Sequence, residues 1–220
     1  MNPILPRLKK HYLPSVFVIL VVGLILHLAW PNKDTVTYIT DSTGYIAIVV
    51  LVLSLIIGPI NLLLKRCNPY TNNFRRDIGI VGGLLAVIHS VTGLFVHLRG
   101  NNWQYFLTKS DLGYAIRLDD FGLANYFGLI STLLIILLLI TSNDYSIRKL
   151  GVVKWKNLQR FSYFMFIFAL VHCIYYRIVM NNLMLTFSLY LPAFLVVLIF
   201  QKTGVSIKLR ERKRKMEATS

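Results

Sequence analysis

Long apolar stretches alternate along this chain with short polar or basic segments. Six of the stretches approach the roughly 20 apolar residues that a helix needs to cross the hydrocarbon core of a bilayer. They are residues 13–30, 45–64, 78–98, 121–140, 161–178 and 183–200. The pattern predicts an all-α fold, an integral membrane bundle of six helices.

The segments between these stretches are short, and the longest of them covers residues 99–120. None can hold a soluble flavin or nicotinamide domain, and the phosphate-binding motifs GxGxxG and GxxxxGK are absent from the sequence. We therefore expect a single transmembrane domain over residues 1–220, with its core at 40–180 and a basic tail at 202–220. We find no internal repeat.

Two details modify this pattern. The basic N-terminus precedes an apolar run, as in a signal peptide, but the run lacks a small-residue cleavage site and is long enough to span, so we expect a retained first helix. Pro59 in the second predicted helix and Pro192 in the sixth each remove a backbone hydrogen bond, which predicts local kinks.

The distribution of charged residues predicts the orientation of the chain in the membrane. The mean hydropathy is +0.60 and only 15% of the residues are charged, which is typical of a membrane protein. The formal net charge of +15 is also found in nucleic-acid binders, but here the basic residues lie between apolar runs rather than on one polar face, so we expect no nucleic-acid partner. If the predicted helices cross in alternation, 19 of the 24 Lys and Arg residues share one side.

Positive residues favour the cytoplasmic side, so both termini are predicted to be cytoplasmic in a multi-pass protein of the cell inner (plasma) membrane. We expect the basic run at 208–215 to contact anionic membrane lipids, which attract each such charge by about 1 kcal/mol. The two cysteines, Cys67 and Cys173, fall toward opposite ends of different predicted helices, so no disulfide is expected. The CxxCH motif of covalent haem attachment is absent.

Histidines inside apolar stretches need a reason, because an ionisable side chain is costly in a membrane. His89 lies about 18 Å and His172 about 21 Å from the cytoplasmic starts of their predicted helices. The two helices run in the same direction, so both side chains reach a similar depth. Two interpretations follow: either the imidazoles are the axial ligands of one haem, or they form hydrogen bonds to neighbouring helices.

The other histidines are weaker candidates. His27 stands near the outer end of the first predicted helix and is interpreted as an interfacial residue. His97 falls at the end of the third, where headgroups and water can satisfy it, and His11 precedes the first.

Four arginines complete the candidate site. Arg99 and Arg177 lie beyond the two central histidines at the outer ends of their helices, where each either pairs with a haem propionate or reaches the lipid headgroups. Arg75 and Arg76 lie at the cytoplasmic end of the third predicted helix. These two arginines are predicted to set the orientation of the chain in the membrane. The alternative is that they also bind an anionic flavin or quinol headgroup.

Several short motifs lie in and beside the second to fifth predicted helices. They are Ser42-Thr43-Gly44, Pro59, Arg75-Arg76-Asp77-Ile78-Gly79, His89, Thr141-Ser142, Leu150-Gly151, Trp155, Leu158, Tyr163 and His172. Together they resemble the ferric-reductase-like transmembrane domain family, most closely its MsrQ/YedZ branch, in which a haem-binding membrane subunit serves a periplasmic methionine sulfoxide reductase. The resemblance covers approximately residues 40–176.

The resemblance implies haem b, with iron bound by His89 and His172. It also implies electron transfer from a cytoplasmic flavin (FMN) or quinone-type donor to an acceptor at the outer face, such as a periplasmic reductase partner or ferric iron. One position departs from the family: Gln159 stands thirteen residues before His172, where the family usually has a histidine. Glutamine is a poor haem ligand, so one haem rather than two is expected.

The sequence thus predicts a membrane cytochrome b that passes electrons through one bis-histidine haem to a redox partner protein. The alternative is a haem-bearing or non-redox structural subunit of a larger membrane electron-transfer complex. A transporter is disfavoured, because the apolar interiors of the six stretches contain no Asp or Glu.

Overall fold

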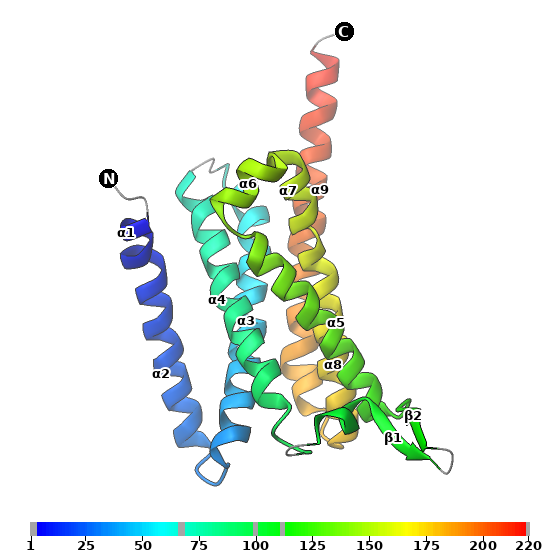
Figure 1. Cartoon of the computed structure of the whole chain (residues 1–220). Helices are drawn as coiled ribbons and strands as arrows, with labels where there is room; N and C mark the ends of the chain where they lie inside the picture. The colour runs from blue at the N-terminus through cyan, green and yellow to red at the C-terminus, as the bar shows by residue number, and fades with distance from the viewer. Residues whose placement is uncertain (1–3, 66–68, 99–100, 111–112, 219–220) are drawn as a thin grey trace.

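The computed structural model describes residues 4–65, 69–98, 101–110 and 113–218, and it is built mainly of long helices that run side by side (Figure 1). The long helices are α2 (Leu13–Ala29), α3 (Thr35–Leu63), α4 (Pro69–Gly93), α5 (Asp120–Thr141), α8 (Phe161–Val179) and α9 (Leu191–Glu217). Short elements connect them: α6 (Asp144–Leu150) and α7 (Val152–Gln159) join α5 to α8, and the π-helix η3 (Thr186–Tyr190) precedes α9. The predicted all-α membrane fold is confirmed at this level.

Within the described residues, five helical segments are long and apolar enough to cross a membrane: Leu5–Ala29, Thr35–Leu63, Asp120–Thr141, Val152–Val179 and Thr186–Glu217. Helix α4 is not among them. Its glycines, together with Arg76, Asp77 and His89, make it less apolar than its neighbours. The chain is therefore a multi-pass membrane protein with five spans by this criterion.

Several helices extend beyond the predicted apolar stretches. Helix α3 starts ten residues before position 45, because the carboxylate of Asp34 caps it by accepting a 3.2 Å hydrogen bond from the backbone N–H of Thr37. Helix α4 starts at Pro69 and ends at Gly93, five residues before its predicted end. Helix α9 continues through the basic tail to Glu217 and projects past the other helices (Figure 1).

The core lies where α3 is enclosed by α4 on one side and by α8 and α9 on another. Its largest buried cluster joins α3, α8 and α9. It contains Ile48, Leu55, Ile56, Phe166, Leu170, Tyr190, Ala193 and Val197. Helix α4 packs closely on α3 and α5, and α8 packs closely on α5, whereas α4 and α8 are not a closely packed pair. The bundle therefore has α4 and α8 facing each other across its interior.

Pro59 lies inside α3, where its missing N–H leaves the carbonyl of Leu55 without its usual helical donor. The side chain of Gln201 on α9 supplies that donor, with Nε2 at 2.8 Å from the Leu55 oxygen. A Cβ on Gly204 would lie only 3.3 Å from Pro59, so this glycine lets α9 approach α3 closely at the same level. Pro192 is the second residue of α9, which continues the π-helix η3 without a break in the helical segment Thr186–Glu217. The regular α-helical pattern is therefore interrupted by a π-helix just before this proline.

The outer connection between α4 and α5 contains structure that the hydropathy pattern does not reveal. It holds a 3₁₀ turn η2 (Asn102–Tyr105) and an antiparallel hairpin of β1 (Leu107–Ser110) and β2 (Gly113–Ile116). Tyr105 is 1% exposed, and its hydroxyl donates to the carbonyl of Gly93 and accepts from the backbone N–H groups of His97 and Leu98. The Tyr105 hydroxyl thus gives hydrogen-bond partners to backbone groups at the end of α4 and just after it.

A buried carboxylate attaches the N-terminal segment to the bundle. Asp77 on α4 is 1% exposed and accepts hydrogen bonds from Arg7, from Nδ1 of His11 at 2.6 Å and from the hydroxyl of Tyr12 at 2.9 Å. Arg7 ends α1 (Ile4–Arg7), and the other two donors lie in the π-helix η1 (Leu8–Tyr12). None of the residues of α2 is buried, so these polar contacts are a main attachment of the first helix.

We expect Asp77→Asn to lower the thermal stability of the protein in detergent micelles and to expose the N-terminal helix to protease. The reason is that Arg7 would lose its carboxylate, and removing one partner of a buried ion pair costs about 3–5 kcal/mol. Asp41→Asn is the matched control, because the Lys33–Asp41 pair has side chains 31% and 30% exposed and is worth about 1 kcal/mol or less. Equal losses in the two variants would contradict this role of Asp77.

Candidate functional site

The structure places the rings of His89 on α4 and His172 on α8 next to each other in the interior of the bundle. Their ring centroids are 6.1 Å apart and their planes make an angle of 77°. These are the two histidines whose helical depths match in the sequence. Their helices are not in close contact, so the imidazoles reach toward each other across the space between α4 and α8.

Each imidazole is held by a hydrogen bond to a backbone carbonyl. Nδ1 of His89 lies 2.8 Å from the oxygen of Thr40 on α3, and Nδ1 of His172 lies 2.8 Å from the oxygen of Ala124 on α5. A carbonyl oxygen only accepts, so each Nδ1 carries the proton and donates it. The same bond fixes the tautomer in which Nε2 keeps a lone pair, the form of histidine that binds a metal.

A glycine stands one helical turn after each of these carbonyls. A Cβ at Gly44 would lie 2.7 Å from Nδ1 of His89, and a Cβ at Gly128 would lie 2.7 Å from Nδ1 of His172. A Cβ atom essentially never comes this close to another heavy atom, so any larger residue would displace the ring. The glycines let each histidine lie flat against the neighbouring helix.

The two halves of the site are therefore built alike. In the pair α3–α4 and again in the pair α5–α8, the second helix supplies the histidine, and the first supplies a carbonyl and, four residues later, a glycine. This structural repeat corrects our expectation of no internal repeat. Three matching positions spread over about fifty residues are too few to be seen in one sequence.

The spacing of the rings suits one metal ion between them. A metal about 2 Å from each of two imidazole nitrogens places the ring centroids roughly 6 Å apart. Among the described residues, no group of three or more His, Cys, Asp or Glu side chains forms a metal site, so the remaining ligands of such an ion must come from the bound group itself. Thr40 adds a buried hydroxyl oxygen without a hydrogen-bond partner beside His89. The donor set fits the iron of a haem, which brings four nitrogens and takes two axial histidines.

Comparison with known proteins agrees with this geometry. Residues 43–170 match the family described as Ferric reductase like transmembrane component. The chain belongs to this ferric reductase-like family. The match contains Gly44, His89 and Gly128 but ends two residues before His172, so the second histidine is joined to the site by the structure. A search of curated proteins finds no match.

Arg177 lies one helical turn and a half beyond His172 in this ferric reductase-like chain and is partly buried. Its guanidinium donates to the hydroxyl of Tyr45 and lies 5.7 Å from the centre of that ring, and it also bonds the hydroxyl of Tyr190. Both partners are neutral phenols, so the cation can accommodate an anionic group. Arg99, the other arginine proposed for an anionic group, lies outside the described residues.

Arg75 and Arg76 are held by the protein itself. Nε of Arg75 donates to the carbonyl of Ser54 at 3.1 Å, in the part of α3 near Pro59. Nη1 of Arg76 lies 2.6 Å from the carboxylate of Asp144 on α6, while its Nε is buried without a partner. The structure thus gives both residues a packing role and does not bring them to the histidine pair.

The remaining predicted positions have ordinary surroundings. Gln159 donates to the hydroxyl of Thr141 at 3.2 Å, next to the bond from the Trp155 indole to the Thr141 carbonyl. His27 is exposed and packs edge-on against Tyr38 with centroids 5.0 Å apart, in keeping with an interfacial residue. Cys173 is a free thiol, and Cys67 lies outside the described residues.

Sequence reasoning missed Thr40, Ala124 and Gly128. The only local signal for them is a small residue spaced four positions from a glycine, a spacing that also serves ordinary helix packing. Tyr176, one of the aromatic residues of the fifth predicted helix, has its ring centroid 5.0 Å from that of His172. The ring centroid of Tyr176 in turn lies 5.9 Å from that of His97, in the connection between α4 and α5. Aromatic rings therefore continue from His172 toward this end of the bundle.

The Arg76–Asp144 pair predicts a dependence of stability on pH. The hydrogen bond from Arg76 lowers the pKa of Asp144, so this carboxylate stabilises the fold above its unfolded pKa of about 3.9 and loses that effect as the pH falls through the folded value. Because Asp144 is 58% exposed, we expect about 1 kcal/mol or less.

The measurement is the difference in melting temperature between the natural protein and Asp144→Asn. The difference should be present at neutral pH, should shrink at high salt, and should vanish in acid below the folded pKa. A difference that grows in acid would show that the pair does not act in this way.

Proposed function

We propose that this protein is a membrane cytochrome b that moves electrons across the bilayer through one haem held by His89 and His172. The observation that carries the proposal is the pair of imidazoles, each donating from Nδ1 to a carbonyl and facing the other at 6.1 Å. Membership of the ferric reductase-like family supports a role in electron transfer.

We further infer that α4 crosses the membrane as a sixth span. It runs beside α3 and packs on α3 and α5, which are both spans by length and hydropathy (Figure 1). Its polar groups have partners inside the bundle, such as the His89 imidazole on Thr40 and the Ser90 hydroxyl on Thr132. Six crossings put both termini on the side with most basic residues, which is the cytoplasmic side of the plasma membrane.

The bound haem supplies reversible one-electron chemistry at iron. His89 and His172 would hold this group through Nε2. The carbonyls of Thr40 and Ala124 fix the orientation of the two rings and make each imidazole a stronger electron donor. Arg177, between two neutral phenols, is the residue placed to pair with a propionate, because a partly buried guanidinium favours a carboxylate.

The family resemblance implies the direction of transfer, and on that ground we propose an acceptor at the outer face, either a periplasmic reductase partner or ferric iron. The histidines lie in the outer half of the predicted bilayer, on the side of that acceptor. Gln159 bonds Thr141, which supports a single haem, so a flavin or a quinol must supply electrons from the cytoplasmic side. Arg75 and Arg76 would not bind that donor without giving up their present contacts.

We expect His89→Ala and His172→Ala each to abolish the b-type absorbance of the purified protein, because one axial ligand cannot replace two in a low-spin centre. The measurement is a reduced-minus-oxidised spectrum with haem quantified against protein. His27→Ala is the control and should keep about one haem per chain, since His27 is exposed and distant from the pair.

Full haem content in either central variant would reject the ligand assignment. A natural protein that binds no haem despite an adequate supply would instead favour a structural subunit of a larger complex. Two haems per chain would contradict the single-site interpretation.

Gly44→Ala and Gly128→Ala should each reduce haem content and alter the low-spin signal in electron paramagnetic resonance. The added methyl group would meet Nδ1 of the adjacent histidine at 2.7 Å and turn the ring away from its carbonyl. Gly93→Ala on α4 is the matched control, since its Cβ would lie 3.7 Å from the nearest side-chain atom. If all three variants behave alike, the glycines do not position the ligands.

A further inference from the structure

The hairpin between α4 and α5 has one apolar and one polar face. Its register pairs Leu107 with Ile116 and Lys109 with Tyr114, and residues directly opposite in an antiparallel ladder point to the same side. Thr108 and its partner Ala115 point to the other side. A ladder this short gains little by itself, so its apolar face needs a covering surface.

That apolar face is uncovered in the protein alone. Tyr114 is 63% exposed, Ile116 is 64% exposed, and Leu118 just after the strand is 72% exposed. Trp103 of η2 adds its indole, which packs edge-on against Tyr114 with centroids 4.7 Å apart. Four large apolar side chains thus gather at one end of the bundle.

The hairpin is fixed to the bundle rather than hanging from it. The backbone N–H of Arg117 donates to the carbonyl of Phe106 at 2.9 Å, and the hydroxyl of Tyr126 on α5 donates to the same carbonyl. Nη1 of Arg117 also donates to the carbonyl of Gln104 at 3.1 Å. These bonds hold the strands in one direction relative to α5.

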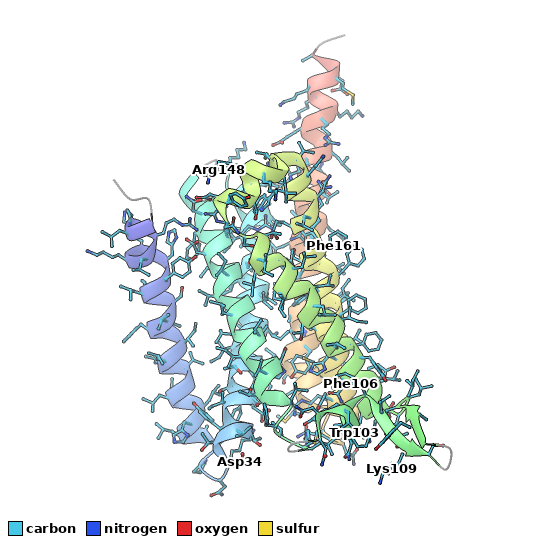
Figure 2. All side chains as sticks on the ribbon, in the orientation of Figure 1. Asp34, Trp103, Phe106, Lys109, Arg148 and Phe161 are labelled. Carbon is cyan, nitrogen blue, oxygen red and sulfur yellow. The ribbon has the colours of Figure 1, made fainter. Side chains whose placement is uncertain are left out.

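That direction is sideways. The strands leave the outer end of α5 and extend away from the helices (Figure 1), and Figure 2 shows Trp103, Phe106 and Lys109 at this same end. A segment that projects sideways from the end of a transmembrane bundle lies over the neighbouring lipid headgroups rather than over the centre of the bundle.

We propose that the face formed by Trp103, Tyr114, Ile116 and Leu118 rests on the lipid headgroup region of the membrane. Tryptophan and tyrosine are favoured there because their rings are apolar with one polar edge, and Lys109 on the same face can place its ammonium among phosphates. Thr108 on the opposite face meets water. The inference needs the membrane insertion of the bundle, and it does not depend on the haem.

The test uses the fluorescence of Trp103, taken as the difference between the natural protein and Trp103→Phe, each in nanodiscs of zwitterionic lipid. Lipids brominated near the carbonyl end of the acyl chain should quench most of this signal, and lipids brominated near the methyl end should quench it less. Iodide in the water should quench it weakly.

Ile116→Ser and Leu118→Ser should shift the emission of Trp103 to longer wavelength and exchange lipid quenching for iodide quenching. Thr108→Ala is the matched control on the polar face and should change neither. Strong iodide quenching without lipid quenching in the natural protein would show that the face meets water and would overturn the proposal. Unchanged lipid quenching in both serine variants would also overturn it, and helical circular dichroism checks that each variant is folded.

Discussion

The hydrogen bond from each partly buried imidazole to a backbone carbonyl is the interaction on which this site depends. A membrane interior offers no water to satisfy an N–H group, so Nδ1 of His89 and Nδ1 of His172 must find acceptors in neighbouring helices. They find them at Thr40 and Ala124, in helices that already donate and accept along their own backbones. The bond requires the ring to lie against the helix, which explains why Gly44 and Gly128 follow one turn later.

The same need to satisfy polar groups shapes the end of the bundle that holds the N-terminal segment. Asp77 accepts hydrogen bonds from three donors of that segment, and the carbonyl that Pro59 leaves without a donor is satisfied by Gln201. Both contacts fix the position of helices that apolar packing alone would leave free to slide, because lipid covers apolar surfaces as well as a neighbouring helix does. Polar contacts therefore help to specify which helices are neighbours.

The histidine pair is symmetric, but its two sides differ. Two equivalent helix pairs form a symmetric centre, whereas the surroundings of that centre are unequal. The ring of Tyr176 connects those of His172 and His97 toward the α4–α5 connection, while at the other end of the bundle Gln159 bonds Thr141. In the proposed function the electron donor and acceptor would therefore meet different surroundings on the two sides of the pair.

The sequence alone determined the membrane class, the approximate positions of the long helices and the matching depth of His89 and His172, because hydropathy and helical rise are local properties. It also carried the family resemblance, which the match to residues 43–170 confirmed. The tertiary structure decided what each histidine donates to, across 49 and 48 residues of chain, and which contacts Arg75 and Arg76 make. It also decided the repeat of the two helix pairs and the outer hairpin. These features rest on contacts between distant segments, on which the hydropathy pattern of any one segment has no bearing.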